Sequence, residues 1–171
     1  RWYDHDFGLW EDIQKAKTDS DFVLIIYHGG NEHFPLPSTR LKETFRFFIN
    51  AGASAVIAHH THCFSGYEVY RNAPIFYSLG NFVFDYLNQN NSWQWSTGYA
   101  VSLNIENGIE FEIIPYSQFY LNSLGVSLLE NENLQRFKNE IDEYNRIIAD
   151  ESLLKSEFEK LVNEREQWYL N

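Results

Sequence analysis

The sequence is poor in cysteine, proline, methionine and long apolar runs. Its 171 residues include one cysteine, four prolines and no methionine. The single cysteine, Cys63, excludes both an internal disulfide and a zinc site built from cysteines. No apolar run approaches the roughly 20 residues needed to cross a bilayer, and the N-terminus has no charged-then-apolar signal pattern. Because the chain starts at Arg1 and has no methionine, we expect its natural beginning to lie upstream.

Basic residues are also scarce. The chain has 24 acidic and 13 basic residues, a formal net charge of -11, and no cluster of lysine or arginine. This balance argues against binding to nucleic acid or to an anionic membrane surface. In contrast, 44% hydrophobic and 18% aromatic residues supply enough apolar area for a sizeable core. We therefore expect one globular domain, with or without an appendage.

The first half of the chain follows a helix, strand, helix, strand order. Apolar residues recur at helical spacing over 9–16 and again over 41–49, and compact apolar runs occupy 22–27 and 53–58. Since both runs are short and continuously apolar, we expect two buried parallel strands that are joined by a helix in a βαβ unit.

The second half changes to short aromatic and β-branched runs, which predict strands without helices between them. An Asn-Gly turn at 107–108 indicates that the last two of these strands pair antiparallel, and the polar segment 88–97 is expected to be an exposed loop. The predicted strands are 67–70, 74–78, 82–84, 98–105 and 109–114.

Beyond residue 127 the pattern predicts a helical hairpin with a turn at 149–152. Its many acidic residues are expected to form a solvated face rather than an interaction tail. The fold class is therefore α/β, with a βαβ unit, then mixed or antiparallel strands, and a C-terminal helical hairpin. We place the main domain at residues 1–126 and the hairpin appendage at 127–171.

Histidines follow both strands of the predicted βαβ unit. His28 ends the first strand, and His59, His60 and His62 follow the second. Because the carboxyl ends of parallel strands meet at one edge of a sheet, these imidazoles are expected to converge. Neutral imidazole is the commonest protein ligand for zinc-like metals. In addition, His60 and His62 would point the same way if their loop is extended. We predict a metal site here.

Other polar residues near these strands have two interpretations each. Glu32 follows His28 across a Gly-Gly turn, where it either orients an imidazole or accepts a proton, or is simply solvated. Asn81 follows the strand at 74–78, where it either faces the crevice and contacts substrate or forms a turn. His5 and His33 are expected to be a solvated terminal residue and a loop residue. A nucleophilic role for Cys63 with His62 is disfavoured, since adjacent residues in extended backbone point apart.

Three segments carry a family resemblance. They are HGGNE at 28–32, AGASAVIAHHTH at 51–62 and IFYSLGNFVFD at 75–85. In order and spacing they resemble the bacterial poly-gamma-glutamate capsule synthesis family, known as CapA or PGA-cap proteins, and the match runs from about residue 21 to residue 85. That family is similar to calcineurin-like metallophosphoesterases, so the resemblance implies the C-terminal part of a metallophosphoesterase-like α/β sandwich.

The resemblance assigns roles to individual residues. It makes His28 an isolated metal-binding histidine and His60 and His62 the histidine pair of a Gly-His-x-His motif. His59 stands where that motif has glycine, as in the family's own His-His-x-His version, and with Glu32 it is expected to orient the ligands.

The sequence departs from the family pattern at two positions and in one larger respect. Ala58 stands where the family usually has glycine, and Gly29 where it usually has tryptophan. More importantly, nothing before Phe22 resembles the Asp-x-His, Gly-Asp and Gly-Asn-His motifs that supply carboxylates in the superfamily. The complete site would hold two divalent ions (zinc, manganese or iron) about 3.5 to 4 Å apart, with anionic ligands. This chain alone is expected to hold one ion on three histidines or none.

The resemblance also implies a function for the longer protein. We expect a metal-dependent hydrolase of a phosphoester or of a glutamyl or cell-surface polymer substrate in the cell envelope, inactive as this chain alone and completed by the missing N-terminal half. The alternative is a non-catalytic component that binds or assembles surface polymer. Trp93 and Trp95 would suit that role, because flat aromatic faces stack on such ligands.

Overall fold

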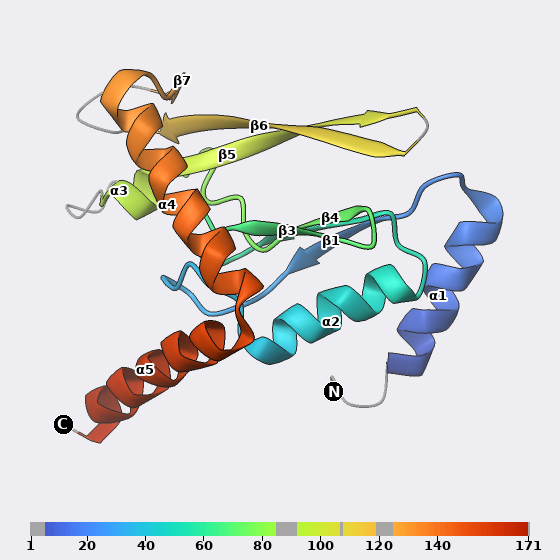
Figure 1. The fold of residues 1–171 in the computed structure, drawn as a ribbon, viewed down its shortest axis with the longest axis horizontal. Coiled ribbons are helices and arrows are strands. Elements are labelled where there is room, and N and C mark those ends of the chain that lie inside the picture. Colours follow the sequence, from blue (N-terminus) through green and yellow to red (C-terminus); the bar gives the residue numbers. More distant parts are fainter. Residues whose placement is uncertain (1–5, 85–91, 107, 119–124, 171) are drawn as a thin grey trace.

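The computed structural model describes residues 6–84, 92–106, 108–118 and 125–170, with the side chains of 6–7 and 167–170 left aside. The fold is mixed α/β, with two sheets and a layer of helices (Figure 1). The elements in chain order are α1 (Asp6–Asp19), β1 (Leu24–His28), α2 (Thr39–Asn50), β2 (Ala55–His59), β3 (Tyr67–Tyr70), β4 (Ala73–Phe76), α3 (Trp93–Ser96), β5 (Thr97–Ile105), β6 (Ile109–Gln118), β7 (Val126–Leu128), α4 (Asn131–Ala149) and α5 (Glu151–Leu170).

The first sheet has the strand order β1-β2-β4-β3. β1 and β2 are parallel, with Leu24 opposite Ala55 and His28 opposite His59, so the predicted βαβ unit is confirmed. The connecting helix α2 begins at the N-cap Ser38, whose side chain accepts a hydrogen bond from the amide of Leu41. Its buried aromatic residues pack on one face of the sheet, in a cluster that includes Phe45, Phe48, Val56, Ile75 and Tyr77.

β1 is not the buried strand that its apolar composition predicted. Alternate residues along it are exposed, and Ile26 retains 65% of its accessible surface. The reason lies in the strand order, because β1 is the edge strand of its sheet. Ile25 and Tyr27 on its other face do pack against the core under α2. A short apolar run therefore predicted the strand correctly and its burial incorrectly.

The second sheet has the order β5-β6-β7 and packs on the other face of the first sheet (Figure 1). β5 and β6 form the predicted antiparallel hairpin, in register from Thr97 opposite Ser117 to Ile105 opposite Ile109. Asn107 of the expected turn lies outside the described residues. The second apolar cluster lies between the sheets and includes Phe64, Phe76, Trp93, Tyr99 and Phe137.

Two local predictions between β4 and β5 were wrong. Residues 82–84, expected to form a strand, pair with no strand in the described part of the chain and expose Phe82, Val83 and Phe84. Within the predicted exposed loop 88–97, residues 93–96 form the short helix α3, in which Trp93 is buried. Its indole donates a hydrogen bond to Glu140 of α4, which explains the burial of an aromatic residue in a polar segment. Residues 88–91 lie outside the described part of the chain.

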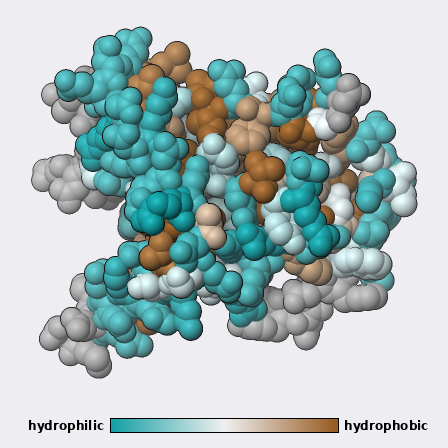
Figure 2. All heavy atoms as spheres, viewed as in Figure 1, coloured by the Kyte–Doolittle hydropathy of each residue, from teal (hydrophilic) through white to brown (hydrophobic). Residues whose placement is uncertain are grey.

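The predicted helical hairpin is confirmed as α4 and α5, which are separated at Asp150. The carboxylate of Asp150 accepts hydrogen bonds from the amides of Ser152 and Leu153, and so caps the start of α5. Figure 2 shows mainly hydrophilic side chains over α4 and α5, as expected of a solvated face. On the opposite side of these helices, Ile148 and Leu154 are fully buried in the core under α2. The division after residue 126 stays a prediction. No helix among the described residues is long and apolar enough to span a membrane.

A polar cluster ties α2 to the first sheet. Arg46 of α2 donates two hydrogen bonds to Glu68 of β3, at 3.0 and 2.6 Å, and the hydroxyl of Tyr77 donates a third at 2.6 Å. Burial alone would raise the pKa of Glu68, but the hydrogen bonds from Arg46 and Tyr77 outweigh it and lower that pKa. Because the folded-state pKa lies below the unfolded value, the ionised carboxylate stabilises the fold.

The substitution Glu68→Gln tests this contribution. We expect a loss of about 1 kcal/mol in unfolding free energy at pH 7, a modest value because Arg46 is partly exposed and screened. The stabilisation is present above the unfolded pKa of about 4.3 and is lost as the pH falls through the lowered folded pKa. Urea denaturation at pH 7 and pH 3 should therefore show a difference from wild type that shrinks at the lower pH. Glu143→Gln, in the exposed pair with Arg146, is the control and should change the unfolding free energy less at either pH, because solvent screens this pair. A pH-independent loss in the Glu68 variant would contradict this account.

Candidate metal centre

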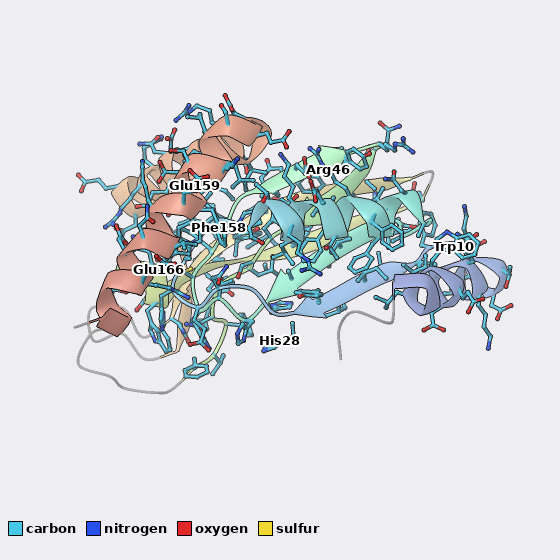
Figure 3. All side chains as sticks on the ribbon, turned by 90° about the horizontal axis from the view of Figure 1, so that it is seen from below. Trp10, His28, Arg46, Phe158, Glu159 and Glu166 are labelled. Carbon is cyan, nitrogen blue, oxygen red and sulfur yellow. The ribbon has the colours of Figure 1, made fainter. Side chains whose placement is uncertain are left out.

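The predicted site residues meet at the carboxyl ends of β1 and β2. His28 and His59 are the last residues of these strands and lie opposite one another in the parallel register. Figure 3 shows His28 at the end of β1, at the margin of the molecule away from α2. Parallel pairing therefore brings together histidines that are 31 positions apart in the sequence.

His28 and His60 are in direct contact. Nε2 of His28 lies 3.2 Å from Nδ1 of His60, and the ring centroids are 4.9 Å apart. This separation suits a hydrogen bond between a protonated and an unprotonated nitrogen. It also suits two ligands of one ion, because zinc–imidazole distances of about 2.0–2.1 Å place two such nitrogens about 3.3 Å apart.

Glu32 lies on the other side of the His60 ring. Its carboxylate is 3.7 Å from Nε2 of His60, and its side chain is more than half exposed. The two ring nitrogens of His60 thus face different partners, His28 through Nδ1 and Glu32 through Nε2. A carboxylate behind a ligating imidazole fixes its orientation and raises its basicity. The orienting role expected for Glu32 stays a prediction.

His62 pairs with Asn81 rather than with the other histidines. Nδ1 of His62 lies 2.9 Å from Oδ1 of Asn81. The Asn81 amide nitrogen donates to the carbonyl oxygens of His62 and Trp95, so the side chain is held at three points. Asn81 therefore faces the histidines, as one interpretation of its position required. Contact with substrate stays a prediction.

Aromatic rings surround His62. Trp95 stacks on it at 5.1 Å between centroids, Phe84 meets it edge-on at 5.2 Å, and His33 lies 6.1 Å away in a stacked orientation. Sequence reasoning placed His33 in a loop and assigned it no part in the site. Nothing in the local sequence indicates that these rings surround His62, because His33 and Phe84 come from separate segments.

The backbone at the site is strained. Three of the six described non-glycine residues with positive φ are His33 (59°), His60 (113°) and His62 (59°). Each such conformation costs on the order of 1–3 kcal/mol and is typical of functional sites. The loop after β2 is thus not the extended segment that the sequence argument assumed. The rings of His60 and His62 are nevertheless 6.1 Å apart, because the two unusual dihedrals redirect them.

Hydrogen bonds between the two loops hold this strained geometry. The amide of Gly29 donates to the carbonyl of His59 at 3.0 Å, and the amide of His33 donates to the carbonyl of Thr61 at 2.8 Å. The hydroxyl of Thr61 is buried, donates to the carbonyl of Cys63 and shares a second hydrogen bond with the hydroxyl of Ser78. From α5, Arg165 donates to the carbonyl of Glu32 at 2.7 Å.

His59 and Cys63 have pKa values shifted by burial. Burial, assisted by the neighbouring His28, lowers the pKa of His59, so its ring is neutral at physiological pH. Burial raises the pKa of Cys63 to about 11, so the thiol is protonated there and a poor nucleophile. Assistance of the ligands by His59 stays a prediction.

The donors are arranged in pairs. Within the described residues, no group of three or more histidine, cysteine, aspartate or glutamate side chains could hold a metal ion. The structure instead provides the His28–His60 pair and, beside it, the His62–Asn81 pair. These are nitrogen and amide-oxygen donors without a carboxylate between them. The predicted three-histidine arrangement around a single ion is not preformed and stays a prediction, as do the ligand roles of His28, His60 and His62.

Comparison with known proteins finds a family match for the first half of the chain. Residues 6–86 match the family model described as bacterial capsule synthesis protein PGA_cap. Residues 6–86 are therefore similar to the PGA_cap family, over slightly less than half of the chain. The segment matched begins within α1 and includes β1 to β4, all the described site residues up to Phe84, and the strained loops.

Named relatives agree with this assignment. The chain is 40% identical over 81 residues to "Capsule biosynthesis protein CapA" of Bacillus anthracis, covering 45% of this chain and 20% of the relative. It is 42% identical over 73 residues to "PGA biosynthesis protein CapA" of Bacillus subtilis (strain 168), covering 43% and 19%. An uncharacterized protein of Sinorhizobium fredii, y4sH, is 37% identical over 82 residues, covering 45% and 17%. The aligned part of the chain thus spans about a fifth of the length of each of these relatives.

The turn that delivers Asn81 depends on Gly80. This residue has φ +81°, and an added Cβ would lie 2.8 Å from the carbonyl oxygen of Thr97 and 3.0 Å from Cα of Gly98. Both neighbours are backbone atoms that cannot move aside cheaply.

We therefore expect Gly80→Ala to lower the unfolding free energy by at least about 2 kcal/mol, because strain and overlap add. Gly125→Ala is a matched control, since Gly125 has φ +85° but no atom within 4 Å of the added Cβ. It should cost only the backbone strain, about 1 kcal/mol. Urea denaturation measures both, and equal losses would contradict a close packing of the turn against β5.

Proposed function

We propose that the histidine cluster of this PGA_cap region is part of a divalent-metal centre in a hydrolase. The observation that supports this most directly is the pairing of donors, with His28 and His60 3.2 Å apart and His62 and Asn81 2.9 Å apart. Both pairs lie at the carboxyl ends of parallel strands, where α/β proteins place their ligands. The strained dihedrals of His60 and His62 are a second, independent support.

The donor set fits such a centre in part. His28 and His60 would hold one ion, and His62 with Asn81 would hold a second. Two ions on neutral donors alone would repel strongly, so the centre needs anionic ligands from outside the described residues. When bound, divalent ions supply Lewis-acid chemistry to a phosphoryl or carbonyl oxygen.

The chain's own residues orient and shield this centre. Glu32, whose carboxylate lies 3.7 Å from Nε2 of His60, would orient that ring, and Asn81 is fixed by the carbonyl oxygens of His62 and Trp95. The stacked ring of Trp95 and the edge of Phe84 cover His62 and limit the access of water. Limiting water strengthens electrostatic interactions at the centre.

The substrate class follows from the relatives. Their names refer to capsule biosynthesis and to PGA biosynthesis, so we propose a phosphoester or a glutamyl or other cell-surface polymer as the substrate, with the protein at the cell envelope. The alternative is a polymer-binding component without turnover, for which Trp93 and Trp95 were the expected contacts. One of these two residues is not accessible. Trp93 is buried and bonded to Glu140, and only Trp95 remains partly accessible.

Metal titration of single variants tests the centre. We expect zinc or manganese to bind the wild-type chain weakly, and His28→Ala and His60→Ala each to lower the affinity at least about tenfold in isothermal titration calorimetry. Glu32→Gln should lower it by a smaller factor, since it only orients His60. The control His33→Asn removes a nearby imidazole while tolerating the same positive φ, and should bind as wild type.

The outcome decides between the hypotheses. Equal affinity in wild type and in a His28→Ala/His60→Ala double variant would exclude the proposed centre. If metal binds but the longer protein turns over neither bis(p-nitrophenyl) phosphate nor a γ-glutamyl polymer, the binding alternative is supported. Turnover that disappears in His60→Ala supports the hydrolase.

A further inference from the structure

The helical hairpin of α4 and α5 contacts two segments that border the histidines, the loop 29–38 after β1 and the short helix α3. The hairpin lies outside residues 6–86, the part of the chain that matches the PGA_cap model. Its inward side is anchored in the core under α2, where Ile148 and Leu154 are fully buried. From this anchor α5 extends to the loop, and α4 extends to α3.

One face of α5 reaches the loop after β1. Leu154, Phe158 and Arg165 share this face, because positions four and seven apart lie together on a helix. The ring of Phe158 contacts that of Phe34, with 6.3 Å between centroids, and Figure 3 shows Phe158 on the side of α5 toward α2. Further along the helix, Arg165 donates to the carbonyl of Glu32 at 2.7 Å. The helix is thus held against the loop at two points.

Arg165 holds one peptide group that Thr61 holds from the other side. The carbonyl of Glu32 and the amide of His33 belong to the same planar trans peptide, so they point in opposite directions. Arg165 donates to the carbonyl, and the amide donates to the carbonyl of Thr61 at 2.8 Å. Because this plane defines one side of the φ torsion of His33, the two bonds together hold the positive φ of 59°.

The second contact joins α4 to α3. Trp93 of α3 is buried, and its indole donates to one carboxylate oxygen of Glu140 at 3.0 Å. Arg136 donates to the other oxygen at 2.8 Å, and its guanidinium carbon lies 4.3 Å from the centroid of the indole ring. Two residues further along α3, Trp95 stacks on His62. The carboxylate of Glu140 therefore fixes the helix that carries Trp95.

We propose that the hairpin positions the candidate site, with Arg165 and Glu140 as positioning residues. Arg165 sets the directions of Glu32 and His33 through their shared peptide group, and Glu140 sets the place of Trp95 through α3. Hydrogen bonds that involve an ionised group are stronger than neutral ones, which suits both residues to this role. An effect on metal binding rests on the proposed function, whereas the positioning itself does not.

Hydrogen exchange of the metal-free chain tests Arg165. In Arg165→Ala the peptide group loses its bond to α5, so we expect the amide of His33 to exchange at least about threefold faster. Arg165→Lys keeps a charged donor and should restore part of the protection. Arg146→Ala is the matched control, because that guanidinium bonds to Glu143 within α4, and it should leave His33 unchanged. Both arginines are exposed, so melting temperatures should stay within about 2 °C of wild type.

Proton NMR of His62 tests Glu140. The stacked ring of Trp95 shifts the imidazole proton signals of His62 upfield, and Trp95→Ala gives the same signals without stacking. In Glu140→Ala the indole of Trp93 loses its acceptor, so we expect most of the upfield shift to disappear. Glu140→Gln keeps an acceptor oxygen and should retain the shift. Glu143→Ala, an exposed position of the same helix, is the matched control and should also retain it.

Unchanged results in these variants would overturn the inference. They are wild-type exchange of the His33 amide in Arg165→Ala and wild-type His62 signals in Glu140→Ala. Exchange that rises equally throughout β1 and α5 in Arg165→Ala would also overturn it, because the residue would then affect stability as a whole rather than one loop.

Zinc titration separates this inference from the metal centre. Arg165→Ala should weaken zinc binding no more than Glu32→Gln does, because it acts through that residue. If Arg165→Ala speeds the exchange of His33 but the wild-type chain binds no zinc, the positioning is supported and the metal centre is contradicted. Zinc binding by the wild type, together with unchanged His33 exchange in Arg165→Ala, does the reverse.

Discussion

The parallel pairing of β1 with β2 is the constraint on which the rest of the site depends. It places His28 opposite His59, so the loops that follow both strands start from adjacent points. The bonds from Gly29 to His59 and from His33 to Thr61 continue this pairing past the ends of the strands. A shift of one residue would turn Tyr27 toward the outer face and His28 into the core under α2, because side chains alternate along a strand. The apolar contacts of Ile25 and Tyr27 therefore fix the position of the histidines.

Much of this arrangement could be predicted from the sequence, because it follows from local patterns. Short apolar runs ending in histidine, joined by an amphipathic helix, predicted both strands, their parallel order and the meeting of His28 with His60. The aromatic contacts of His62 could not be predicted, since His33, Phe84 and Trp95 come from three separate segments. The positive φ angles of His60 and His62 could not be predicted from the sequence either, because such angles in non-glycine residues are imposed by tertiary contacts.

The errors share one physical cause. Hydrophobicity measures the tendency of a segment to be covered, not whether the same chain covers it. Leu24 and Ile26 were expected to be buried and are exposed, and residues 82–84 were expected to form a strand and pair with no strand among the described residues. Trp93 shows the opposite case. A polar segment was expected to be exposed, yet this indole is buried and donates to the partly exposed Glu140 of α4. Tertiary partners decided burial in each case.

The loops at the site carry backbone strain, and β1 beside them exposes apolar surface. Positive φ at three histidines costs on the order of several kcal/mol in total, a large fraction of the stability of a typical domain. The bonds of Thr61, Asn81 and Arg165 offset part of this cost within the described residues. Ile26 lies two residues before His28 on the same face of β1. Because it is exposed, roughly 2 kcal/mol of burial free energy is not realised. The bonds that offset the strain come from Ser78 after β4, from Trp95 of α3 and from Arg165 of α5, so the tertiary fold fixes the geometry of these loops.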